Sequence, residues 1–443
     1  MLFRFVRVAC LLAAMSDLVH GQTNSGKDFW VGELPNVDDY SLYPGFNFAI
    51  LVSNPNDVSA TVTISHISDP DVTFVVPPQG LVTQEFPPRA AFDDTGVFTD
   101  MVYHVTSNVD IVATAFVPLQ NYESNDASLR YPVPALGKKH RVLSYMHPTN
   151  SLGSMFGVVA VEDGTSLQSF DLSGNLVDDV LLNRGEMYQR VQRDSMTGWS
   201  LVSDKDVAVF SGTQCTGVGD SGLYCDILYE QVIPEESLGS NYLACPTLTR
   251  PVNCIGSGCA PDAFQYVATQ DGTTISFNNG VSPSVSLNAG ESYLYETNVP
   301  HTATSDKPVY ATQILLSAES GSPAPITGDP ALSLIPLVSQ FQFFYLFNTP
   351  ETFAFDFINV VAPVGTVLTS DGVILDPINC GGSEAGVVDG ITYCCKGYPV
   401  TDGKHTITSS TAFGLTVSGF DIDASYGMCV QLSNRPKHAN ENV

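Results

Sequence analysis

The sequence predicts an all-β protein of four repeated units of about 100 residues each, arranged as tandem antiparallel β-sandwiches. Three observations carry this prediction: segments that recur at a regular spacing, apolar residues that alternate with a period of two, and many Asp-Gly turns. A closed ring that resembles a β-propeller is the alternative arrangement, because copies that close into a ring also remove free sheet edges.

The composition is that of a globular chain. Of 443 residues, 44% are hydrophobic and 10% are aromatic, which excludes wholesale disorder and collagen-like structure. The length corresponds to roughly three domains of ordinary size, so one compact core is not expected.

The repeat is clearest in four segments that share a serine. They begin at Tyr103, Trp199, His301 and His405 and align on Ser107, Ser203, Ser305 and Ser409. The steps between successive serines are 96, 102 and 104 residues. A second pattern keeps the same phase, because an alternating apolar strand enters and leaves a Gly-Thr turn at 156–167, 264–275 and 355–368, with Asn-Asp in place of Gly-Thr at 46–64.

Turn residues separate the predicted strands. Dipeptides that accept positive φ in two-residue hairpins are Asp163-Gly164, Asp271-Gly272, Asn279-Gly280, Asp371-Gly372, Asp389-Gly390 and Asp402-Gly403. No long amphipathic helix interrupts them. Each unit is therefore expected to hold six or seven short antiparallel strands, as an immunoglobulin-sized sandwich does.

These patterns divide the chain into six parts. They are a signal peptide at 1–21, repeat units at 22–130, 131–232, 233–332 and 333–432, and a C-terminal tail at 433–443. The signal peptide is predicted because Arg4 and Arg7 precede the apolar run 8–15 and small residues end at Gly21. No later stretch is apolar for long enough to cross a bilayer, so a secreted, extracellular chain without membrane insertion is expected.

The charge excludes one class of partner. Acidic residues number 46 and basic residues 18, a formal net charge of -28 at pH 7, and no basic cluster interrupts the acidic chain. Nucleic acid and anionic lipid would be repelled rather than attracted. We therefore expect no nucleic-acid partner.

The cysteines predict disulfides rather than metal ligands. Once Cys10 leaves with the signal peptide, they form two groups, which are Cys215, Cys225, Cys245, Cys254 and Cys259, and Cys380, Cys394, Cys395 and Cys429. The odd thiol is expected in the first group, either free or joined to another chain. Cys394 and Cys395 are neighbours and are expected to reach separate partners.

No catalytic constellation is found in the sequence. Gly219-Asp220-Ser221-Gly222 is similar to the nucleophile segment of trypsin-like proteases, but Leu223 stands where those enzymes need glycine. A serine is activated only by a general base held close to it, and the histidine that those enzymes present beside a cysteine is missing. The interpretation favoured here is a polar loop held by Cys215 and Cys225.

Two further groups of residues leave alternatives open. The rings of Tyr103, Trp199, His301 and His405 suit either a ligand-facing platform or packing within the strands, and packing is favoured. The acidic pairs are Asp38-Asp39, Asp93-Asp94, Asp178-Asp179 and Asp421 with Asp423. Such pairs serve glycoside hydrolysis or bind calcium, but no specific motif for either is present. No cofactor is therefore assigned, and calcium is left open.

The combined motifs are similar to one known family. The strand-Gly-Thr-strand element, the segments Leu182–Tyr188 and Leu287–Tyr293, and the Ser305–Val309 hairpin resemble the IgG Fc-binding protein N-terminal domain family over about Gly26 to Gln431. This resemblance implies a secreted, adhesive or mucus-associated binding module. Founding members continue into von Willebrand type D modules, whereas this chain ends at Val443, so assembly through such modules is not expected. A domain name does not imply antibody binding.

The functional expectation is an extracellular, non-enzymatic binding or adhesion protein, whose partners are proteins or glycans. A secreted glycan hydrolase that uses paired carboxylates is the first alternative. A structural polymer or oligomer, linked by disulfides through the odd cysteine, is the second.

Overall fold

A computed structural model describes residues 24–36, 47–87, 94–118, 124–219, 224–247, 262–278, 284–317, 328–421 and 424–430. These residues form an all-β protein with no α-helix among them. Every pairing between the described strands is antiparallel, and so are the isolated bridges outside them. The predicted fold class is confirmed. The signal peptide and the C-terminal tail lie outside the described residues.

Four sheets correspond to the four sequence repeats. Unit 1 contains β1 (Gly26–Gly32), β2 (Phe48–Ser53), β3 (Ala60–His66), β4 (Asp69–Val76), β5 (Leu81–Phe86), β6 (Gly96–Phe98), β7 (Val102–Val117) and β8 (Asp126–Leu129). Unit 2 contains β9 (Gly137–Arg141), β10 (Ser151–Ala160), β11 (Thr165–Phe170), β12 (Leu176–Leu182), β13 (Met187–Gln192), β14 (Ser200–Thr216) and β15 (Asp226–Val232).

The other two units repeat the same order. Unit 3 contains β16 (Gly239–Ala244), β17 (Asp262–Ala268), β18 (Thr273–Phe277), β19 (Val285–Leu287), β20 (Ser292–Thr297), β21 (His301–Ile314) and β22 (Leu332–Leu334). Unit 4 contains β23 (Gln342–Thr349), β24 (Phe355–Pro363), β25 (Leu368–Ser370), β26 (Val373–Ile374), β27 (Glu384–Val388), β28 (Ile391–Val400), β29 (Gly403–Asp421) and β30 (Ala424–Cys429).

The two sequence patterns that repeat in phase lie side by side in every unit. Each aligned serine pairs with an apolar residue of the strand that follows the Gly-Thr or Asn-Asp turn. The pairs are Ser107 with Val62, Ser203 with Leu167, Ser305 with Ile275, and Ser409 with Leu368. The repeat in the sequence is therefore a repeat of strand register.

One long strand in each unit joins two layers of a sandwich. In unit 1, the first half of β7 pairs with β1 and β3, whereas its second half pairs with β2 and β8. The equivalent strands β7, β14, β21 and β29 are 16, 17, 14 and 19 residues long. The expectation of only short strands was wrong for these four, because a strand that changes layers must span both.

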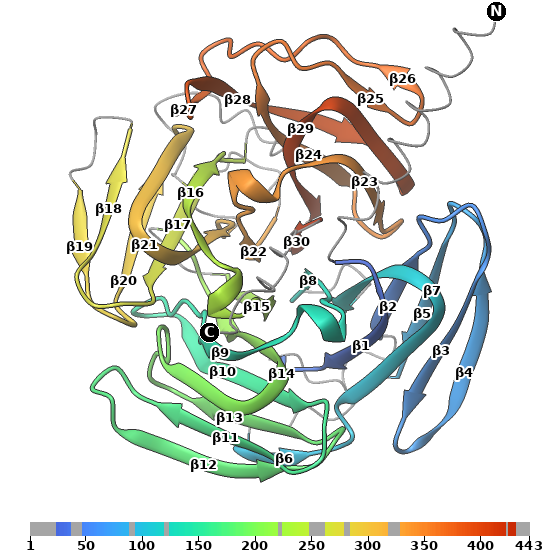
Figure 1. The fold of residues 1–443 in the computed structure, drawn as a ribbon, viewed down its shortest axis with the longest axis vertical. Helices are drawn as coiled ribbons and strands as arrows, with labels where there is room; N and C mark the ends of the chain where they lie inside the picture. Colours follow the sequence, from blue (N-terminus) through green and yellow to red (C-terminus); the bar gives the residue numbers. More distant parts are fainter. Residues whose placement is uncertain are drawn as a thin grey trace, which may run out of the picture.

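The four units surround a common centre (Figure 1). The last strand of each unit is innermost: β8 lies beside β15 and β30, and β22 lies beside the same two strands. The ring closes where unit 4 meets unit 1, as the Asn24 side chain donates a hydrogen bond to the Val430 carbonyl at 3.1 Å. Sandwich-like units and a ring, treated as alternatives above, are therefore combined in one fold.

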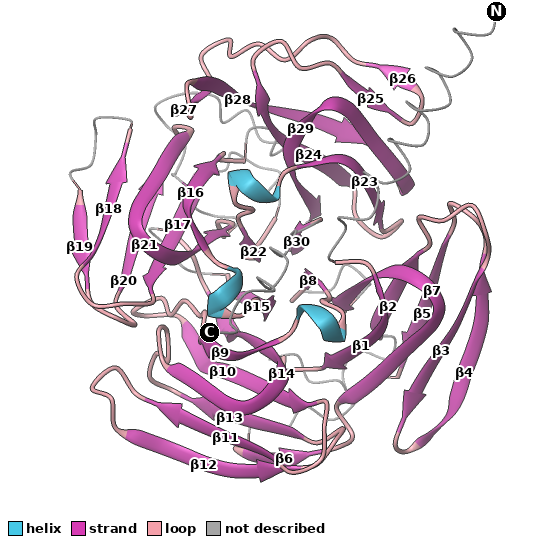
Figure 2. Ribbon diagram, viewed as in Figure 1, coloured by secondary structure: helices cyan, strands magenta, loops and turns pink. Residues whose placement is uncertain are grey.

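The joints between units repeat as well. A 3-10 helix of three residues precedes each of the last three units, at Val133–Ala135, Glu235–Ser237 and Val338–Gln340, and all three face the centre of the ring (Figure 2). Two details differ from the predicted division of the chain. The division after residue 332 cuts through β22, which pairs with β21, and β6 joins the edge of β13 in unit 2.

Candidate functional site at the centre of the ring

The inner strands bring polar side chains of different units together at the ring centre. We call Asp126, Arg130, Asp226, Glu230 and Asp329 the central hub. Four of these five residues are acidic, and all of them are buried. Because β8, β15, β22 and β30 are edge strands, their outer N–H groups need acceptors that no neighbouring strand supplies.

The carboxylate of Asp126 accepts hydrogen bonds from the three other units. Its Oδ2 accepts the N–H of Tyr229 at 2.9 Å and that of Leu332 at 3.0 Å, and its Oδ1 accepts the N–H of Gly427 at 3.4 Å. Burial nevertheless raises the pKa of Asp126 well above its usual value, although these N–H groups oppose the shift. One side chain thus holds all four inner strands.

Glu230 performs the same role for unit 3. Its Oε2 accepts the N–H of Leu334 at 3.2 Å, and its Oε1 accepts the hydroxyl of Ser128 in unit 1. Burial raises the pKa of Glu230 to about 7, against the effect of these donors. Burial raises the pKa of Asp226 well above its usual value, and the nearby charge of Asp329 contributes a smaller shift in the same direction.

Arg130 lies at the boundary between units 1 and 2. Its guanidinium carbon is 5.0 Å from the centre of the Phe210 ring and 4.6 Å from that of the Tyr229 ring. The side chain is fully buried, and its three guanidinium nitrogens have no hydrogen-bond partner in the described part of the protein. Burial lowers the pKa of Arg130 from its usual value.

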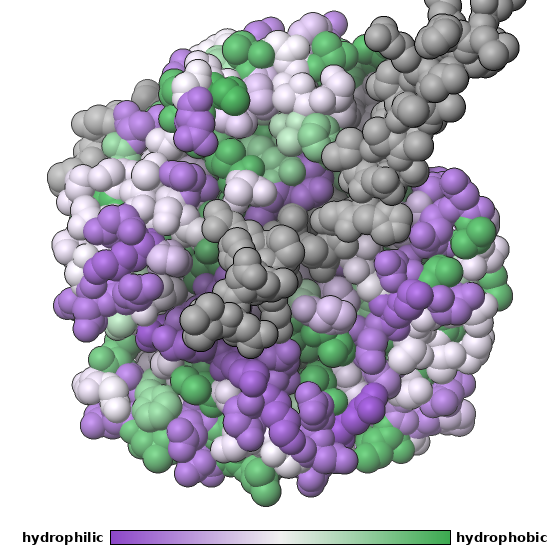
Figure 3. Space-filling view, viewed as in Figure 1, coloured by the Kyte–Doolittle hydropathy of each residue, from purple (hydrophilic) through white to green (hydrophobic). Residues whose placement is uncertain are grey.

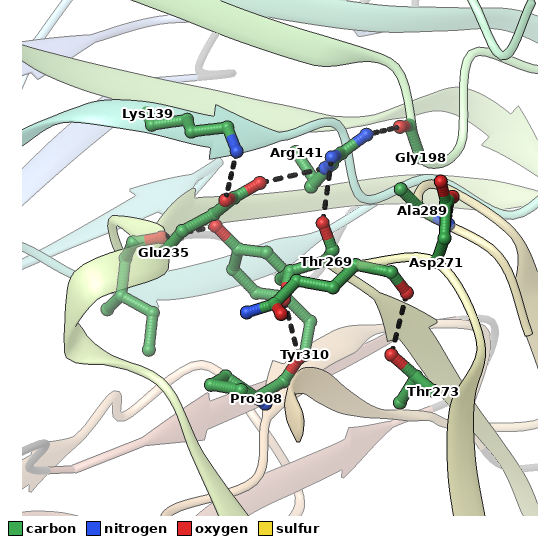
Figure 4. A network of polar contacts seen from close by, with 12 residues as sticks. Lys139, Arg141, Gly198, Glu235, Thr269, Asp271, Thr273, Ala289, Pro308 and Tyr310 are labelled. Carbon is green, nitrogen blue, oxygen red and sulfur yellow. Dashed lines mark hydrogen bonds and ion pairs between the residues drawn. The ribbon is translucent and has the colours of Figure 1, made fainter. Parts of the chain in front are cut away.

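A second polar network joins unit 2 to unit 3 (Figure 4). The guanidinium of Arg141 donates to Glu235 Oε1 at 2.8 Å, to the Gly198 carbonyl at 3.1 Å and to the Thr269 carbonyl at 3.1 Å. Lys139 forms an ion pair with the other Glu235 oxygen at 2.8 Å. In this network Arg141 and Lys139 lie in β9 of unit 2, and Glu235 lies in the 3-10 helix between units 2 and 3. Thr269 belongs to unit 3, so the network fixes the position of unit 3 against unit 2.

The repeated acidic turns also have structural roles. In unit 3, Asp271 Oδ1 accepts the N–H of Ala289 at 3.0 Å, Glu291 accepts the N–H of Asn288 at 2.6 Å, and Lys307 donates to the Asp271 carbonyl. Unit 2 repeats this arrangement with its own Asp163, Glu186 and Lys205. The Asp-Gly, Gly-Glu and Ser-Asp-Lys patterns of the sequence therefore meet at one corner of the unit and bind its backbone.

The four rings at the repeated position lie inside the units. Tyr103, Trp199, His301 and His405 are buried, and neighbouring groups of the same unit contact them. Burial lowers the pKa of His301 to about 4, so this ring is neutral at physiological pH. The four rings therefore pack within the strands, as the favoured interpretation of the sequence expects. The alternative of a ligand-facing platform formed by these rings was wrong.

One of the acidic pairs of the sequence, Asp178 and Asp179, lies wholly within the described residues, and its two carboxylates do not face each other. Asp178 and Asp179 are adjacent in β12, and adjacent strand residues point to opposite faces. Asp178 binds Arg190 at 2.8 Å and accepts the Tyr188 hydroxyl at 2.6 Å, whereas Asp179 is exposed. Asp38, Asp39, Asp93 and Asp423 lie outside the described residues.

The structure brings together one acidic pair that the sequence pattern missed. Asp356 is buried in β24 and accepts the Tyr426 hydroxyl at 2.5 Å. Burial raises the pKa of Asp356 to about 7, and the nearby carboxylate of Asp402 contributes in the same direction. Asp402 follows β28 in the chain, and a search for neighbouring acids in the sequence cannot find two residues this far apart.

Three disulfides are formed by the described cysteines. They are Cys215–Cys225, Cys245–Cys395 and Cys380–Cys394. The first closes the loop that contains Ser221, which lies outside the described residues, as do Cys254 and Cys259. Cys394 and Cys395 reach separate partners, as expected.

One expectation about the cysteines was wrong. The sequence predicts the odd thiol in the first group, but Cys245 of that group bonds to Cys395, and Cys429 of the second group is a buried thiol. The reason is that the ring places β16 of unit 3 against β27 of unit 4. The two sequence groups are thus partly one spatial group.

Other kinds of site receive no support from the described residues. Within them, no group of three or more His, Cys, Asp or Glu side chains is arranged to hold a metal ion. No helix in the same residues has the length and apolar character to span a bilayer. Figure 3 shows apolar surface at the top of the view, where unit 4 lies. The exposed apolar residues of unit 4 include Val364, Val373 and Ile374.

The fold and its centre define a ring of four β-sandwich-like units whose buried polar groups bind the units together. Residues 126–419, more than half of the chain, match the model of the family described as IgGFc binding protein. The chain belongs to this family, a family of binding proteins.

The other comparisons are distant. No curated protein matches the chain. An anti-sigma factor domain-containing protein is 9% identical, with 86% of this chain and 98% of that chain covered and a TM-score of 0.14. A second one, from Clostridium clariflavum, is 10% identical, with coverage of 88% and 98% and a TM-score of 0.13. A tetra-tandem repeat of a large adhesion protein is 11% identical, with coverage of 85% and 92% and a TM-score of 0.09. At these TM-scores the likeness carries no argument.

Proposed function

We propose that this chain is a secreted, non-enzymatic protein of extracellular mucus or matrix that binds proteins or glycans. The observation that carries the proposal is the family match over residues 126–419. The ring supports it, because four similar units present similar loops and sheet faces around one centre, which suits binding of repetitive partners.

The internal polar groups give the same proposal further support. The repeated carboxylates of Asp163, Asp271, Glu186 and Glu291 bind backbone N–H groups within their own units. The hub carboxylates bind N–H groups of the inner strands. A side chain committed to such a bond maintains the fold and is poorly placed to act on a substrate.

The test is a binding screen with the chain from Gln22 to Val443. The purified protein is immobilised and exposed to IgG Fc fragment, to arrays of mucin-type glycans and to extracellular matrix proteins. We expect saturable binding to at least one class at physiological ionic strength, and loss of binding by the heat-unfolded chain. Failure of all three classes to bind would contradict the proposal.

Secretion is tested separately. The full chain is expressed in a secretory cell line, and the N-terminus of the protein in the medium is sequenced. We expect the mature chain to begin at Gln22. Retention of an uncleaved chain inside the cell contradicts the secreted location but leaves the binding result unaffected.

Asp356 and Asp402 favour one alternative, a hydrolase of glycans. A buried carboxyl with a raised pKa beside a second carboxyl is the pairing that such chemistry uses. The wild-type chain and Asp356→Asn are incubated with the same glycans, and release of reducing sugar is measured. We expect no release by either. Release by the wild type that the substitution abolishes would show an enzyme.

The polymer alternative is tested by electrophoresis without reductant. Cys429 is 1% exposed, so it reaches another chain only if the inner strands open. We expect a monomer band from the folded protein. A ladder that collapses on addition of a thiol would show disulfide-linked assembly through another cysteine.

A further inference from the structure

The Arg130 side chain poses a specific physical problem. A guanidinium carries five N–H donors and a full positive charge. In this protein it is fully buried, and the described residues supply no hydrogen-bond acceptor to any of its three nitrogens. Each buried donor left without a partner destabilises the folded state, and a charged donor does so most strongly.

The nearby carboxylates cannot turn toward Arg130 without losing other bonds. Asp126 is bound to the N–H groups of Tyr229 and Leu332, and Glu230 to those of Gln231 and Leu334. These bonds hold the edges of the inner strands. The Asp126 and Glu230 carboxyl groups, which could otherwise bind Arg130, are therefore already hydrogen-bonded to the backbone of the ring.

The same boundary carries other donors without acceptors. Gln231 uses its Oε1 to accept the Tyr131 N–H at 3.0 Å, which leaves its Nε2 unpaired among the described groups. The buried Tyr131 hydroxyl also has no partner there. One unpaired acceptor exists in the hub, Asp226 Oδ2, but it forms no hydrogen bond with Arg130, whose three nitrogens are unpaired as well among the described residues.

We propose that Arg130 holds a small inorganic anion, of the size of chloride, at the boundary between units 1 and 2. The ligand is an anion rather than water because water accepts hydrogen bonds but leaves the charge of the guanidinium unbalanced. It is small because Arg130 is completely enclosed.

Two features of the surroundings suit this ligand. The Phe210 and Tyr229 rings cover the guanidinium face, so its N–H groups point outward in the guanidinium plane, where an anion is bound. Burial favours the protonated forms of Asp126 and Glu230, because it raises both pKa values, and this lowers their repulsion of an anion. Since Arg130 and the two rings belong to different units, the anion is enclosed only where units 1 and 2 pack together.

The first test uses thermal melting of the wild-type chain. The midpoint is measured while sodium chloride replaces sodium gluconate at constant ionic strength. We expect a saturable rise of roughly 3 °C. Arg130→Met should remove the rise, whereas Arg190→Met, which alters another arginine over an aromatic ring, should retain it. An identical rise in Arg130→Met, or no saturable rise in the wild type, would overturn the proposal.

The second test does not depend on a variant that folds. Crystals of the wild-type chain grown in sodium bromide are measured at the bromine absorption edge. We expect an anomalous peak within hydrogen-bonding distance of the Arg130 guanidinium. An ordered water or no density at that place overturns the proposal, whatever the melting curves show.

Discussion

Asp126 and Tyr229 lie on neighbouring inner strands of different units, and the Asp126 carboxylate accepts the backbone N–H of Tyr229 at 2.9 Å. The same carboxylate reaches Leu332 and Gly427 in the remaining units. A ring of sheets ends in inner strand edges that face one another rather than water, and a buried carboxylate supplies the missing acceptors. Asp126 thus joins the four units at the centre of the ring.

Replacement of Asp126 should weaken the entire ring. Asp126→Ala leaves the N–H groups of three units without an acceptor, so we expect the free energy of unfolding to fall by about 3 kcal/mol or more. Asp179→Ala, an exposed control, should change it by less than about 0.5 kcal/mol. Denaturant unfolding measures both. Equal stability of the two variants would show that the hub bonds are dispensable.

The Arg141 network should matter for the position of unit 3 against unit 2. Arg141 and Glu235 are both largely buried, so Arg141→Ala is expected to cost about 3 kcal/mol, because the Glu235 carboxylate then keeps only the more exposed Lys139 as its ion-pair partner. Lys139 is 49% exposed, and Lys139→Ala should cost less than about 1 kcal/mol. Calorimetry of the three proteins checks the ranking, which the reverse order would contradict.

The disulfide between units 3 and 4 should stabilise the ring more than the short one in unit 2. Cys245 and Cys395 are 150 residues apart, whereas Cys215 and Cys225 are 10 apart. On the chain-entropy model, loss of the first bond costs about 5 kcal/mol and loss of the second about 3 kcal/mol. Unfolding of the double serine variant of each pair measures the difference. Peptide mapping under non-reducing conditions should first show both bonds in the wild type.

Glu230 should make stability depend on pH. Burial raises its pKa to about 7 in the folded protein from an ordinary value of 4.5, so between these values the folded state keeps a proton that the unfolded state has lost. The Glu230 contribution is therefore fully present below pH 4.5 and is lost as the pH rises toward 7.

The matched variant for this prediction is Glu230→Gln, which cannot titrate. Asp356 has a raised pKa as well, so only the difference between the wild type and the variant isolates Glu230. We expect the stability of the wild type, relative to the variant, to decrease across this interval in denaturant unfolding series. A difference that is constant or increases with pH would refute the assigned shift.

Much of the unit was predictable from the sequence. In the sequence, Ser203 and Ser305 each follow the Gly-Thr turn of their own unit. In the structure, these serines pair with Leu167 and Ile275, which follow those turns. Local patterns of this kind are readable because strand alternation and positive-φ turns each depend on a few neighbouring residues. Gly164 and Gly272, the second residues of two predicted turns, have φ values of 63° and 61°.

The candidate site was not predictable in the same way. Asp126 is separated from its three backbone N–H donors, Tyr229, Leu332 and Gly427, by 103, 206 and 301 residues. No local pattern marks Asp126 or Arg130, since their roles exist only once the four inner strands meet. The candidate pairs chosen because they are neighbours in the sequence, such as Asp178 and Asp179, point to opposite faces of a strand.

The sequence by itself determined the number of units, the alternation of residues that forms their strands and the turns between strands, because these depend on residue type at short range. The tertiary structure alone decided that the units close into a ring, that Cys245 bonds to Cys395 and that Arg130 is enclosed between units. Those features depend on packing between surfaces far apart in the chain, which the pattern within any one unit does not encode.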